Sequence, residues 1–319
     1  MQQSLRHLQT AFLRFWKKQT KYPRFKNKGG KQSAEYTSAA FRWDGETLSL
    51  AKIGALKIKW SRYFVGEPRT IFVRKTPSGR YYISFQVDGP PREMASAEGA
   101  IGIDLGLTDF AVTSNGSKYQ SPRPLRRKMA QLRRAQKALS RKKNGSGNRN
   151  KARICVAKIN QKISDIRHDF LHKLSTKLVR ENQTIVIEDL NVRGMMTNHC
   201  LAGAIADSSW PEFTRQLVYK CAWYGRELIK IDRWFPSSKR CSRCGYIAES
   251  MSLKVRQWTC PQCGAEHDRD VNAAANISGA GLALKACGGS VRPKRPQGHR
   301  GNCRRSRNHK DAKNVMGAI

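Results

Sequence analysis

The chain has 319 residues, which is enough for one large domain or for two or three small ones with a sizeable buried core. Lysine and arginine together number 61 against 23 acidic residues, so the formal net charge is +38, while 39% hydrophobic residues keep the chain in the globular range. No apolar run approaches the roughly 20 residues that a bilayer crossing requires, and the first residues lack the apolar stretch of a secretory signal. We therefore expect a folded, polyanion-binding protein without a membrane segment.

The first part of the chain is predicted to combine one helix with a small antiparallel sheet or barrel. Apolar residues at helical spacing indicate a basic amphipathic helix that ends near Lys21. From about residue 40 to 87 the period changes to two, and the segments that alternate or are rich in β-branched and aromatic residues are 47–50, 56–60, 70–74 and 81–87. A hairpin turn is predicted around Gly79. The break at 87–91 marks the predicted domain boundary.

The second part of the chain alternates predicted strands with helices, which indicates a mixed α/β region. Short strands are expected at 100–106, 110–113, 184–188 and 228–231, with a turn at Asn115-Gly116. Two helices, about 118–143 and 152–181, should form a helical hairpin. Ser209 and Glu212 have capping-box spacing and predict a helix that runs to about Gly225. A short helix at 271–277 precedes a basic tail, from about Gly288, that we expect to be disordered.

Three acidic residues stand where a charged side chain is costly to bury. Asp104 and Glu188 each follow an Ile-x-Ile run, so each ends a strand that should be buried on both faces. Asp270 opens a small-residue helix that can pack closely on a sheet. If the three converge, they form an oxygen-rich cage for Mg²⁺ or Mn²⁺. Two such ions roughly 3.5–4 Å apart activate water and stabilise the leaving oxygen in phosphodiester hydrolysis.

Two alternatives to this metal site stay open at the level of the sequence. An acid at a strand end more often caps the next helix or pairs with an arginine, and for any one of the three acids alone that interpretation is favoured. The three together favour a metal-dependent nuclease site. Asp109 and Asp189 lie beside the motifs and are the alternative ligands. We rank them lower, because Asp109 falls beyond the turn and Asp189, on period two, points to the face opposite Glu188.

The nine cysteines include two Cys-x-x-Cys pairs, which indicates a reducing compartment and a metal site rather than a disulfide framework. The predicted ligands of a structural zinc ion, in a four-thiolate zinc ribbon, are Cys241, Cys244, Cys260 and Cys263. A glycine follows each pair, where the turn around the metal favours positive φ. His267 is expected to hydrogen-bond Asp270 or to lie on the surface. The five other cysteines are assigned no role.

Basic residues dominate the segment 118–153, which contains no acidic residue. A merely solvated helix would mix signs, so the first arm of the helical hairpin is expected to face phosphates. The predicted nucleic-acid contacts on this arm are Arg126, Arg127, Lys128, Arg133, Arg134 and Lys137. Several aromatic residues of the first part could stack on unpaired bases, although a core position is favoured for each: Tyr22, Phe25, Phe41, Trp43 and Trp60.

Four sequence motifs between about residues 20 and 280 are specific in combination. They are Gly102-Ile103-Asp104-Leu105-Gly106-Leu107, Ile187-Glu188-Asp189-Leu190-Asn191-Val192, Trp234-Phe235-Pro236-Ser237-Ser238-Lys239 with the cysteine pairs, and Asp268-Arg269-Asp270-Val271-Asn272-Ala273-Ala274. With these motifs the chain resembles the TnpB (OrfB) proteins of bacterial insertion sequences, which are relatives of type V CRISPR nucleases.

The resemblance implies an α/β, RuvC-like RNase H fold with a helical hairpin insertion and a zinc ribbon, preceded by a small antiparallel β-barrel, the wedge domain. It implies that Asp104, Glu188 and Asp270 are the catalytic carboxylates and bind Mg²⁺ or Mn²⁺. It also implies that the four paired cysteines bind zinc. The implied parts are a residual N-terminal helical or recognition segment (1–39), the wedge domain (40–90), the nuclease domain (91–240 and 265–285), the zinc ribbon (241–264) and a disordered tail (286–319).

The resemblance also implies RNA-guided, metal-dependent cleavage of DNA, linked to transposition, with DNA and a guide RNA as partners in the bacterial cytosol and nucleoid. Family members usually begin with a longer segment, so we expect a chain that is short at its N-terminus and keeps its nuclease residues. Two other hypotheses are a nucleic-acid-binding protein or relic without turnover, and a transposase that joins strands. The sequence indicates no oligomeric state.

Overall fold

The computed structural model describes residues 2–24, 32–61, 64, 66–89, 94–252 and 254–287. The basic tail from Gly288, Phe25 and Cys303 lie outside the described residues, so the expectations for them stay predictions. In the described ranges, no helix has both the length and the apolar character that a bilayer crossing demands.

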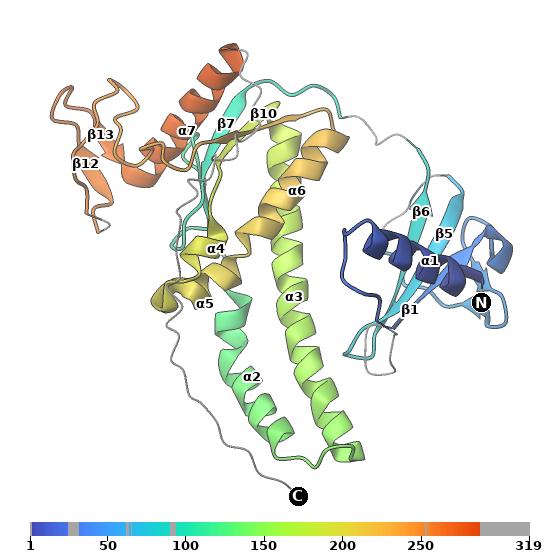
Figure 1. The fold of residues 1–319 in the computed structure, drawn as a ribbon. Helices are drawn as coiled ribbons and strands as arrows, with labels where there is room; N and C mark the ends of the chain where they lie inside the picture. Colours follow the sequence, from blue (N-terminus) through green and yellow to red (C-terminus); the bar gives the residue numbers. More distant parts are fainter. Residues whose placement is uncertain are drawn as a thin grey trace, which may run out of the picture.

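The first part of the chain forms one helix and two small antiparallel sheets (Figure 1). The helix is α1 (Gln2–Trp16). One sheet has the order β1-β5-β6 and the other β2-β3-β4. Their strands are β1 (Gln32–Thr37), β2 (Phe41–Trp43), β3 (Leu48–Leu50), β4 (Gly54–Leu56), β5 (Pro68–Lys75) and β6 (Tyr81–Val87). The predicted strands therefore exist, except that the expected strand 56–60 lies earlier, and β1 and β2 were not among the predicted segments.

The two sheets enclose one core around Leu48, Leu50 and Ile71. Phe41 and Trp43 pack against it, and the Trp60 ring lies 5.3 Å from the Trp43 ring, centroid to centroid. The core position predicted for Phe41, Trp43 and Trp60 is therefore confirmed, whereas the one predicted for Tyr22 is wrong, because that residue is 64% exposed. Gly79 has a φ of +88° in the turn between β5 and β6, as a hairpin at this position requires.

Helix α1 ends at Trp16, five residues before the predicted end near Lys21. Lys18 has a φ of +55°, and its N–H donates to the carbonyl oxygen of Phe15, which closes the helix without the glycine that usually marks such an end. The apolar stripe of the helix remains largely exposed, with Leu5 at 66%.

The second part of the chain is built on a five-stranded sheet of order β11-β10-β7-β8-β9. Its strands are β7 (Ala100–Asp104), β8 (Ala111–Thr113), β9 (Lys118–Tyr119), β10 (Thr184–Glu188) and β11 (Glu227–Ile231). Strands β7, β10 and β11 run parallel, and β8 and β9 complete the sheet as an antiparallel hairpin. Gly116 has a φ of +85° in that hairpin, as the Asn115-Gly116 prediction requires.

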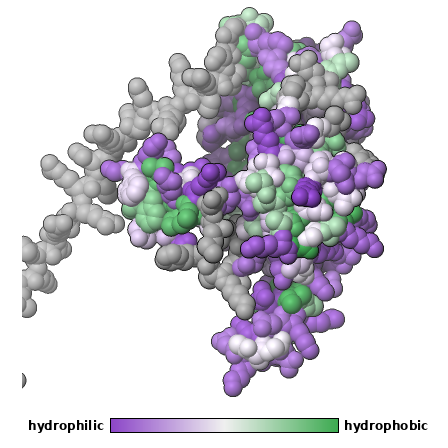
Figure 2. All heavy atoms as spheres, turned by 90° about the vertical axis from the view of Figure 1, so that its right-hand side faces the viewer, coloured by the Kyte–Doolittle hydropathy of each residue, from purple (hydrophilic) through white to green (hydrophobic). Residues whose placement is uncertain are grey.

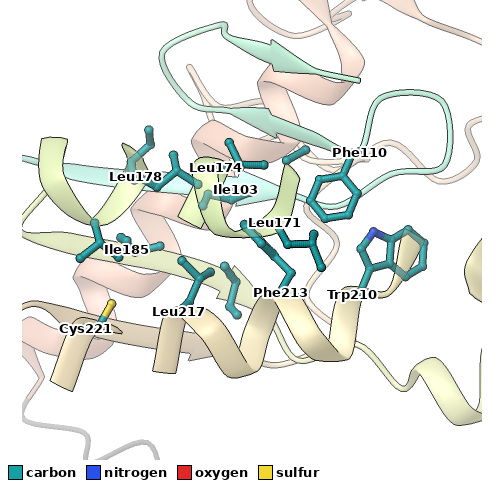
Figure 3. Close-up of a cluster of buried hydrophobic side chains, with 14 of the residues drawn as sticks. Ile103, Phe110, Leu171, Leu174, Leu178, Ile185, Trp210, Phe213, Leu217 and Cys221 are labelled. Carbon is teal, nitrogen blue, oxygen red and sulfur yellow. The ribbon is translucent and has the colours of Figure 1, made fainter. Parts of the chain in front are cut away.

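Helices cover both faces of this sheet, because its buried strands present apolar side chains to either side. The remaining helices are α2 (Pro124–Ser140), α3 (Gly147–Glu181), α4 (Val192–Met195), α5 (His199–Ser208), α6 (Trp210–Trp223) and α7 (Arg269–Ala286). Leu171 of α3 and Phe213 of α6 pack with Ile185 of β10 on one face (Figure 3). On the other face, Ile277 of α7 packs with Val186 of β10.

Helices α2 and α3 form the predicted hairpin, which extends away from the sheet (Figure 1). Its base is fixed by the carboxylate of Asp207, the next-to-last residue of α5, which is buried. This carboxylate accepts the backbone N–H groups of Leu125 and Arg126, both at 3.1 Å, and the Arg167 guanidinium lies 3.0 Å away. One side chain thus caps α2 and ties α2, α3 and α5 together.

The predicted capping box of α6 is wrong, although the helix itself is present. Ser209 adopts a φ of +56°, its side chain makes no cap hydrogen bond to the helix, and its hydroxyl donates to the carbonyl oxygen of Ala206. The Glu212 carboxylate accepts hydrogen bonds from Arg215 and Gln216 instead. The cause is α5, an unpredicted helix that ends at Ser208 and leaves Ser209 as the single residue between two helices.

Helix α7 approaches the sheet closely at Gly102, and replacing this glycine by alanine is expected to destabilise the fold. A Cβ at Gly102 would lie 2.1 Å from the carbonyl oxygen of Ala274 and 2.6 Å from the backbone nitrogen of Ser278. Since both are backbone atoms of α7, the helix must move, at a cost of about 1–3 kcal/mol or more. Thermal unfolding should show a lower Tm.

The matched control is Gly203→Ala in α5, where a Cβ would meet nothing within 4 Å. That variant should keep or slightly raise the Tm, since alanine favours a helix over glycine. Equal melting temperatures of Gly102→Ala and the parent would contradict the close contact between α7 and β7.

Candidate active site and metal centre

The parallel pairing of β7 and β10 brings two of the predicted acids together. Ile103 pairs with Ile187 in the register of the two strands, so Asp104 and Glu188 follow directly at the same edge of the sheet. This is the carboxyl edge of the parallel strands, where sites commonly form in α/β sheets. The period-two alternation and the buried Ile-x-Ile runs thus place both carboxylates at the end of the core.

Asp270 reaches the same region from the first turn of α7. The Asp268 carboxylate caps this helix, accepting the N–H groups of Asp270 and Val271 at 3.1 Å each. Its other oxygen accepts from the Lys118 ammonium at 2.7 Å. Burial opposes ionisation of Asp268, but the ammonium and the helix N–H groups prevail and lower the pKa of this carboxyl. Lys118 in β9 and the contact at Gly102 therefore fix the start of α7 against the sheet.

The charges of the two other acids act on Asp104. Burial, and after it the negative charges of Glu188 and Asp270, raise the pKa of Asp104 from 3.8 to about 7. Burial also raises the pKa of Glu188, opposed by the Ser237 hydroxyl, which donates to Glu188 Oε1 at 2.6 Å. Crowded, partly desolvated oxygen donors of this kind fit a hard divalent cation, which would relieve their repulsion.

Asp270 also has a cationic partner that was not predicted. Arg256, in the connection before β12, places its guanidinium 3.2 Å from Asp270 Oδ2 and 3.5 Å from Oδ1. Its other nitrogen donates to the Thr108 hydroxyl at 3.2 Å. The alternative in which an acid pairs with an arginine therefore holds for Asp270 in this structure. No local pattern singles out Arg256 among the many arginines of the chain, because only the tertiary fold brings it to the site.

The two alternative acids lie differently. Asp189 faces Lys230 and Arg233, with N···O distances of 3.8 and 3.6 Å, and its side chain is 41% exposed. Asp109 lies in the segment after β7, where its carbonyl oxygen is the nearest atom to a Cβ placed on Gly106. The largest causes of the raised pKa of Asp104 are burial, Glu188 and Asp270.

The four paired cysteines form a compact cluster of sulfur atoms. All four Sγ atoms lie within 4.8 Å of one another, with 3.7 Å between Cys241 and Cys263 and 3.6 Å between Cys244 and Cys260. A tetrahedral zinc ion with Zn–S bonds of about 2.3 Å separates its sulfur ligands by about 3.8 Å. The cluster therefore can hold a metal such as zinc.

Each cysteine pair folds into the same turn. The Gly245 N–H donates to the carbonyl oxygen of Cys241, and the Gly264 N–H donates to that of Cys260. These glycines have φ values of +83° and +67°, as predicted. Strands β12 (Gln257–Thr259) and β13 (Glu266–Asp268) pair antiparallel beside the second turn.

His267 differs from its prediction. Its Nε2 lies 3.0 Å from the sulfur of Cys241, rather than beside Asp270. The pairing of β12 with β13 aims this side chain back at the cysteine cluster, opposite Trp258. Among the other cysteines, Cys221 belongs to the buried core, and Cys155, Cys200 and Cys287 are exposed.

Two buried asparagines of α7 attach the first cysteine turn to the site. Asn272 accepts the Ser242 N–H at 2.9 Å and donates to the carbonyl oxygen of Arg240 at 2.7 Å. Asn276 donates to the carbonyl oxygens of Ser237 and Arg240, at 2.9 and 2.6 Å. Since the Ser237 hydroxyl also donates to Glu188, hydrogen bonds connect the first cysteine turn, α7 and Glu188.

The predicted nucleic-acid contacts all lie on α2, which contains no acidic residue. Five of the six side chains are exposed and Lys128 is half-buried. Figure 2 shows hydrophilic residues interspersed with hydrophobic ones on the face that it draws. The arm therefore presents uncompensated positive charge to solvent.

Comparison with known proteins gives two family matches. The description "Probable transposase" (OrfB of the IS605 type) matches residues 83–199. The description "Cas12f1-like, TNB domain" matches residues 210–277, which include the cysteine cluster. The matched ranges together include Asp104, Glu188 and Asp270. They define the class of protein as transposase-associated.

Individual relatives narrow this class. A protein of Streptomyces pristinaespiralis named "Putative RNA-guided DNA endonuclease" is 51% identical over 305 residues, covering 94% of this chain and 76% of the relative. The Escherichia coli protein "Putative RNA-guided DNA endonuclease InsQ" is 31% identical, covering 93% of this chain and 77% of the relative. A Cas12f1 chain solved in a complex with sgRNA and target DNA matches with a TM-score of 0.48 at 18% identity, over 66% of this chain and 45% of that one. The chain belongs to the TnpB-like family of transposase-associated RNA-guided DNA endonucleases.

Proposed function

We propose that this chain is a Mg²⁺- or Mn²⁺-dependent DNA endonuclease directed by a guide RNA. Two observations carry the proposal: the pairing of β7 with β10 ends in Asp104 and Glu188 at the carboxyl edge of the parallel strands, and the charges of Glu188 and Asp270 act on Asp104. The names of the relatives support the same activity. In this proposal DNA and a guide RNA are the partners, and the activity is linked to DNA transposition.

The proposed architecture is a RuvC-like RNase H domain formed by 91–240 and 265–285. The five-stranded sheet with helices on both faces supports it. The hairpin of α2 and α3 would be an insertion in this domain, and 241–264 a zinc ribbon held by the four cysteines. The sheets of 40–90 would be the wedge domain.

Asp104, Glu188 and Asp270 would hold the divalent ions. When bound, these ions supply Lewis-acid activation of water and stabilise charge on the phosphodiester oxygens. Ser237 orients Glu188 through its hydroxyl. Arg256 can exchange its contact with Asp270 for a phosphate oxygen, since a guanidinium pairs with either anion. The four thiolates would close the shell of a structural zinc ion and leave no position for water.

The test is cleavage of a matching duplex by the purified full chain with its copurified RNA and Mg²⁺. We expect a cut duplex whose products end in a 3′ hydroxyl, and no cut when Mg²⁺ is removed by a chelator. Product ends joined to a second duplex would instead show a transposase that transfers strands.

The second candidate function is nucleic-acid binding without turnover, and the ion pair between Arg256 and Asp270 favours it. If that ion pair persists when nucleic acid binds, the carboxylate site lacks one ligand. Binding of the duplex without cleavage, across several divalent ions, would support this candidate over the nuclease.

Removing positive charge from α2 is expected to weaken nucleic-acid binding and its salt dependence. In the triple variant Arg133→Gln, Arg134→Gln and Lys137→Gln, each lost phosphate contact should reduce the slope of log K against log salt by about 0.9 for duplex DNA. Three lost contacts would thus reduce the slope by roughly 2–3. Binding measured by fluorescence anisotropy between low and moderate salt gives this slope.

The matched control replaces three basic residues that already pair with acids. Lys173, Arg215 and Lys285 lie 2.8, 2.7 and 2.6 Å from Asp169, Glu212 and Glu227. Their replacement by glutamine should leave the slope nearly unchanged. If the slope of log K against log salt falls equally in both triple variants, binding depends on the net charge of the chain and not on the position of the basic residues on α2.

A further inference from the structure

An exposed tryptophan stands beside the carboxylate site. Trp234 lies in the connection between β11 and the first cysteine turn, and it is 84% exposed. No other large hydrophobic residue in the described ranges is as exposed. Tryptophan buries much apolar surface in most folded proteins, so exposure of this extent does not serve the stability of the fold.

The backbone that carries Trp234 is rigidly held. The Trp234 N–H donates to Asp232 Oδ1 at 2.7 Å, and the next N–H, of Phe235, donates to the Asp232 carbonyl oxygen at 3.1 Å. The Phe235 ring packs against the core cluster on the α7 face of the sheet. Three residues after Trp234, the Ser237 carbonyl oxygen accepts from Asn276. The indole is therefore presented on a fixed loop, which lowers the entropy cost of binding something on it.

The same loop connects Trp234 to the proposed catalytic carboxylates. Ser237 donates to Glu188 at 2.6 Å, and three residues of chain span at most about 10 Å. A nucleotide chain covers such a distance in a few units. On the other side, the Arg233 guanidinium lies 3.6 Å from Asp189, the residue that follows Glu188, and its side chain is 42% exposed. The loop thus carries a basic residue directly before Trp234 in the chain, and the carboxylates lie within a few nucleotides of the indole.

We propose that Trp234 stacks on an unpaired base of the DNA strand that enters the carboxylate site, and so positions the strand for cleavage. This inference rests on the proposed function. A flat, exposed indole on a loop that also carries an arginine matches the recognition of single strands, in which bases stack on aromatic faces and basic groups bind phosphates. Because every base has a π face, the contact is independent of sequence. In a duplex the bases are stacked on one another and cannot occupy this position.

The test measures binding of labelled oligothymidylate of about 16 nucleotides to the full chain, in the Asp104→Asn background to prevent cleavage. Variants are Trp234→Ala, Trp234→Leu and Trp234→Phe. Stacking is worth about 1–3 kcal/mol per base, so Trp234→Ala and Trp234→Leu should raise Kd roughly 5- to 150-fold. Trp234→Phe should raise it less, because phenylalanine keeps an aromatic face.

The matched control is Trp223→Ala. Trp223 is also exposed, at 48%, but it ends α6 and precedes β11, at the end of this strand opposite Trp234. This variant should keep the Kd of the parent within about twofold. A second readout is 2-aminopurine placed at successive positions of the probe. Its fluorescence should be quenched at one or two positions when the parent chain binds, and this quenching should be absent when Trp234→Ala binds.

Equal Kd values for Trp234→Ala and the parent would overturn the inference, and so would full affinity of Trp234→Leu, which keeps apolar bulk without a ring face. If Trp234→Ala raises the Kd of an oligouridylate probe more than that of oligothymidylate, the assignment to the DNA strand is overturned. Cleavage by the chain with Asp104 intact is measured separately: its absence would defeat the proposed function, whereas cleavage with unchanged Kd values would defeat this inference alone. Unchanged metal content and Tm exclude misfolding of the variants.

Discussion

Replacing Asp104 by asparagine is expected to abolish Mg²⁺-dependent cleavage while raising the Tm of the metal-free protein at pH 8. The two effects have one cause. A carboxylate that is buried and faces Glu188 and Asp270 is suited to a cation, and without the cation its charge destabilises the fold. If the bound metal stabilises the transition state of cleavage by several kcal/mol, its loss lowers the cleavage rate by at least about 10²-fold.

The pH dependence of the stability follows from the direction in which the pKa of Asp104 is shifted. Burial, then Glu188 and Asp270, raise the folded-state pKa of Asp104 from 3.8 to about 7, so the folded state holds this proton more tightly than the unfolded state does. Stability therefore falls as the pH rises from about 4 to about 7, by at most about 1.4 kcal/mol per pH unit from this group, and the loss is complete above the folded pKa. Asparagine does not titrate, so the variant should lack this part of the fall when Tm is measured between pH 5 and 8 with a chelator.

Asp109→Asn is the matched control, because it removes a carboxylate of the same type five residues away in the chain. It should cleave as the parent does and keep the parent's pH profile. Added Mg²⁺ should raise the Tm of the parent and of this control but not that of Asp104→Asn. Equal cleavage by Asp104→Asn and the parent would defeat the assignment of the site.

Loss of the cysteine cluster is expected to disable the carboxylate site as well as the metal-binding turns. Cys260→Ser removes one of four sulfur donors from a cluster that can hold zinc, and structural zinc contributes about 10–16 kcal/mol to folding in zinc-finger peptides. The connection from Arg240 through Asn276 to Ser237 and Glu188 passes this loss to the site. Metal analysis should show zinc in the parent and much less in the variant, together with faster proteolysis within 241–264 and lost cleavage.

Cys155→Ser is the control for this experiment, since Cys155 is exposed on α3 and outside the cluster. It should keep both the metal and the cleavage activity. If Cys260→Ser loses its metal and still cuts DNA at the parent's rate, the two sites are independent, and the hydrogen bonds of Asn276 do not transmit the structure of the ribbon.

Much of the second part of the chain was predictable because its strands are short apolar runs buried on both faces and its long helices have apolar stripes. Strands β7, β10 and β11 and the helical hairpin lie where the pattern predicted them. Helix α5 was missed because its sequence, His-Cys-Leu-Ala-Gly-Ala-Ile-Ala-Asp-Ser, has a weak amphipathic pattern and no charged face. Without α5, Ser209 resembled a capping residue. Helix α7 was predicted too short, since its small residues contribute to close packing rather than to a wide apolar stripe.

The candidate site could be predicted from the sequence only as far as the order of the strands in the sheet could be predicted. Two parallel strands that end in acids bring those acids together if they are neighbours, and the pairing of Ile103 with Ile187 makes them so. Contacts that elements distant in the sequence make with the site and with α2 could not be predicted from local sequence patterns. Arg256 reaches Asp270 from the connection before β12, and Asp207 reaches the start of α2 from α5. Both depend on tertiary packing, which periodicity and spacing do not describe.

The continuity of α3 has a mechanical consequence. This helix has 35 residues, about 52 Å at 1.5 Å per residue, and runs without a break from the hairpin tip into the core beneath β10. The basic helix α2, which packs on α3, and the sheet therefore form one rigid body. A nucleic acid helix bound along α2 would lie at a fixed distance from the acids at the sheet edge. That distance would determine the position at which the strand is cleaved.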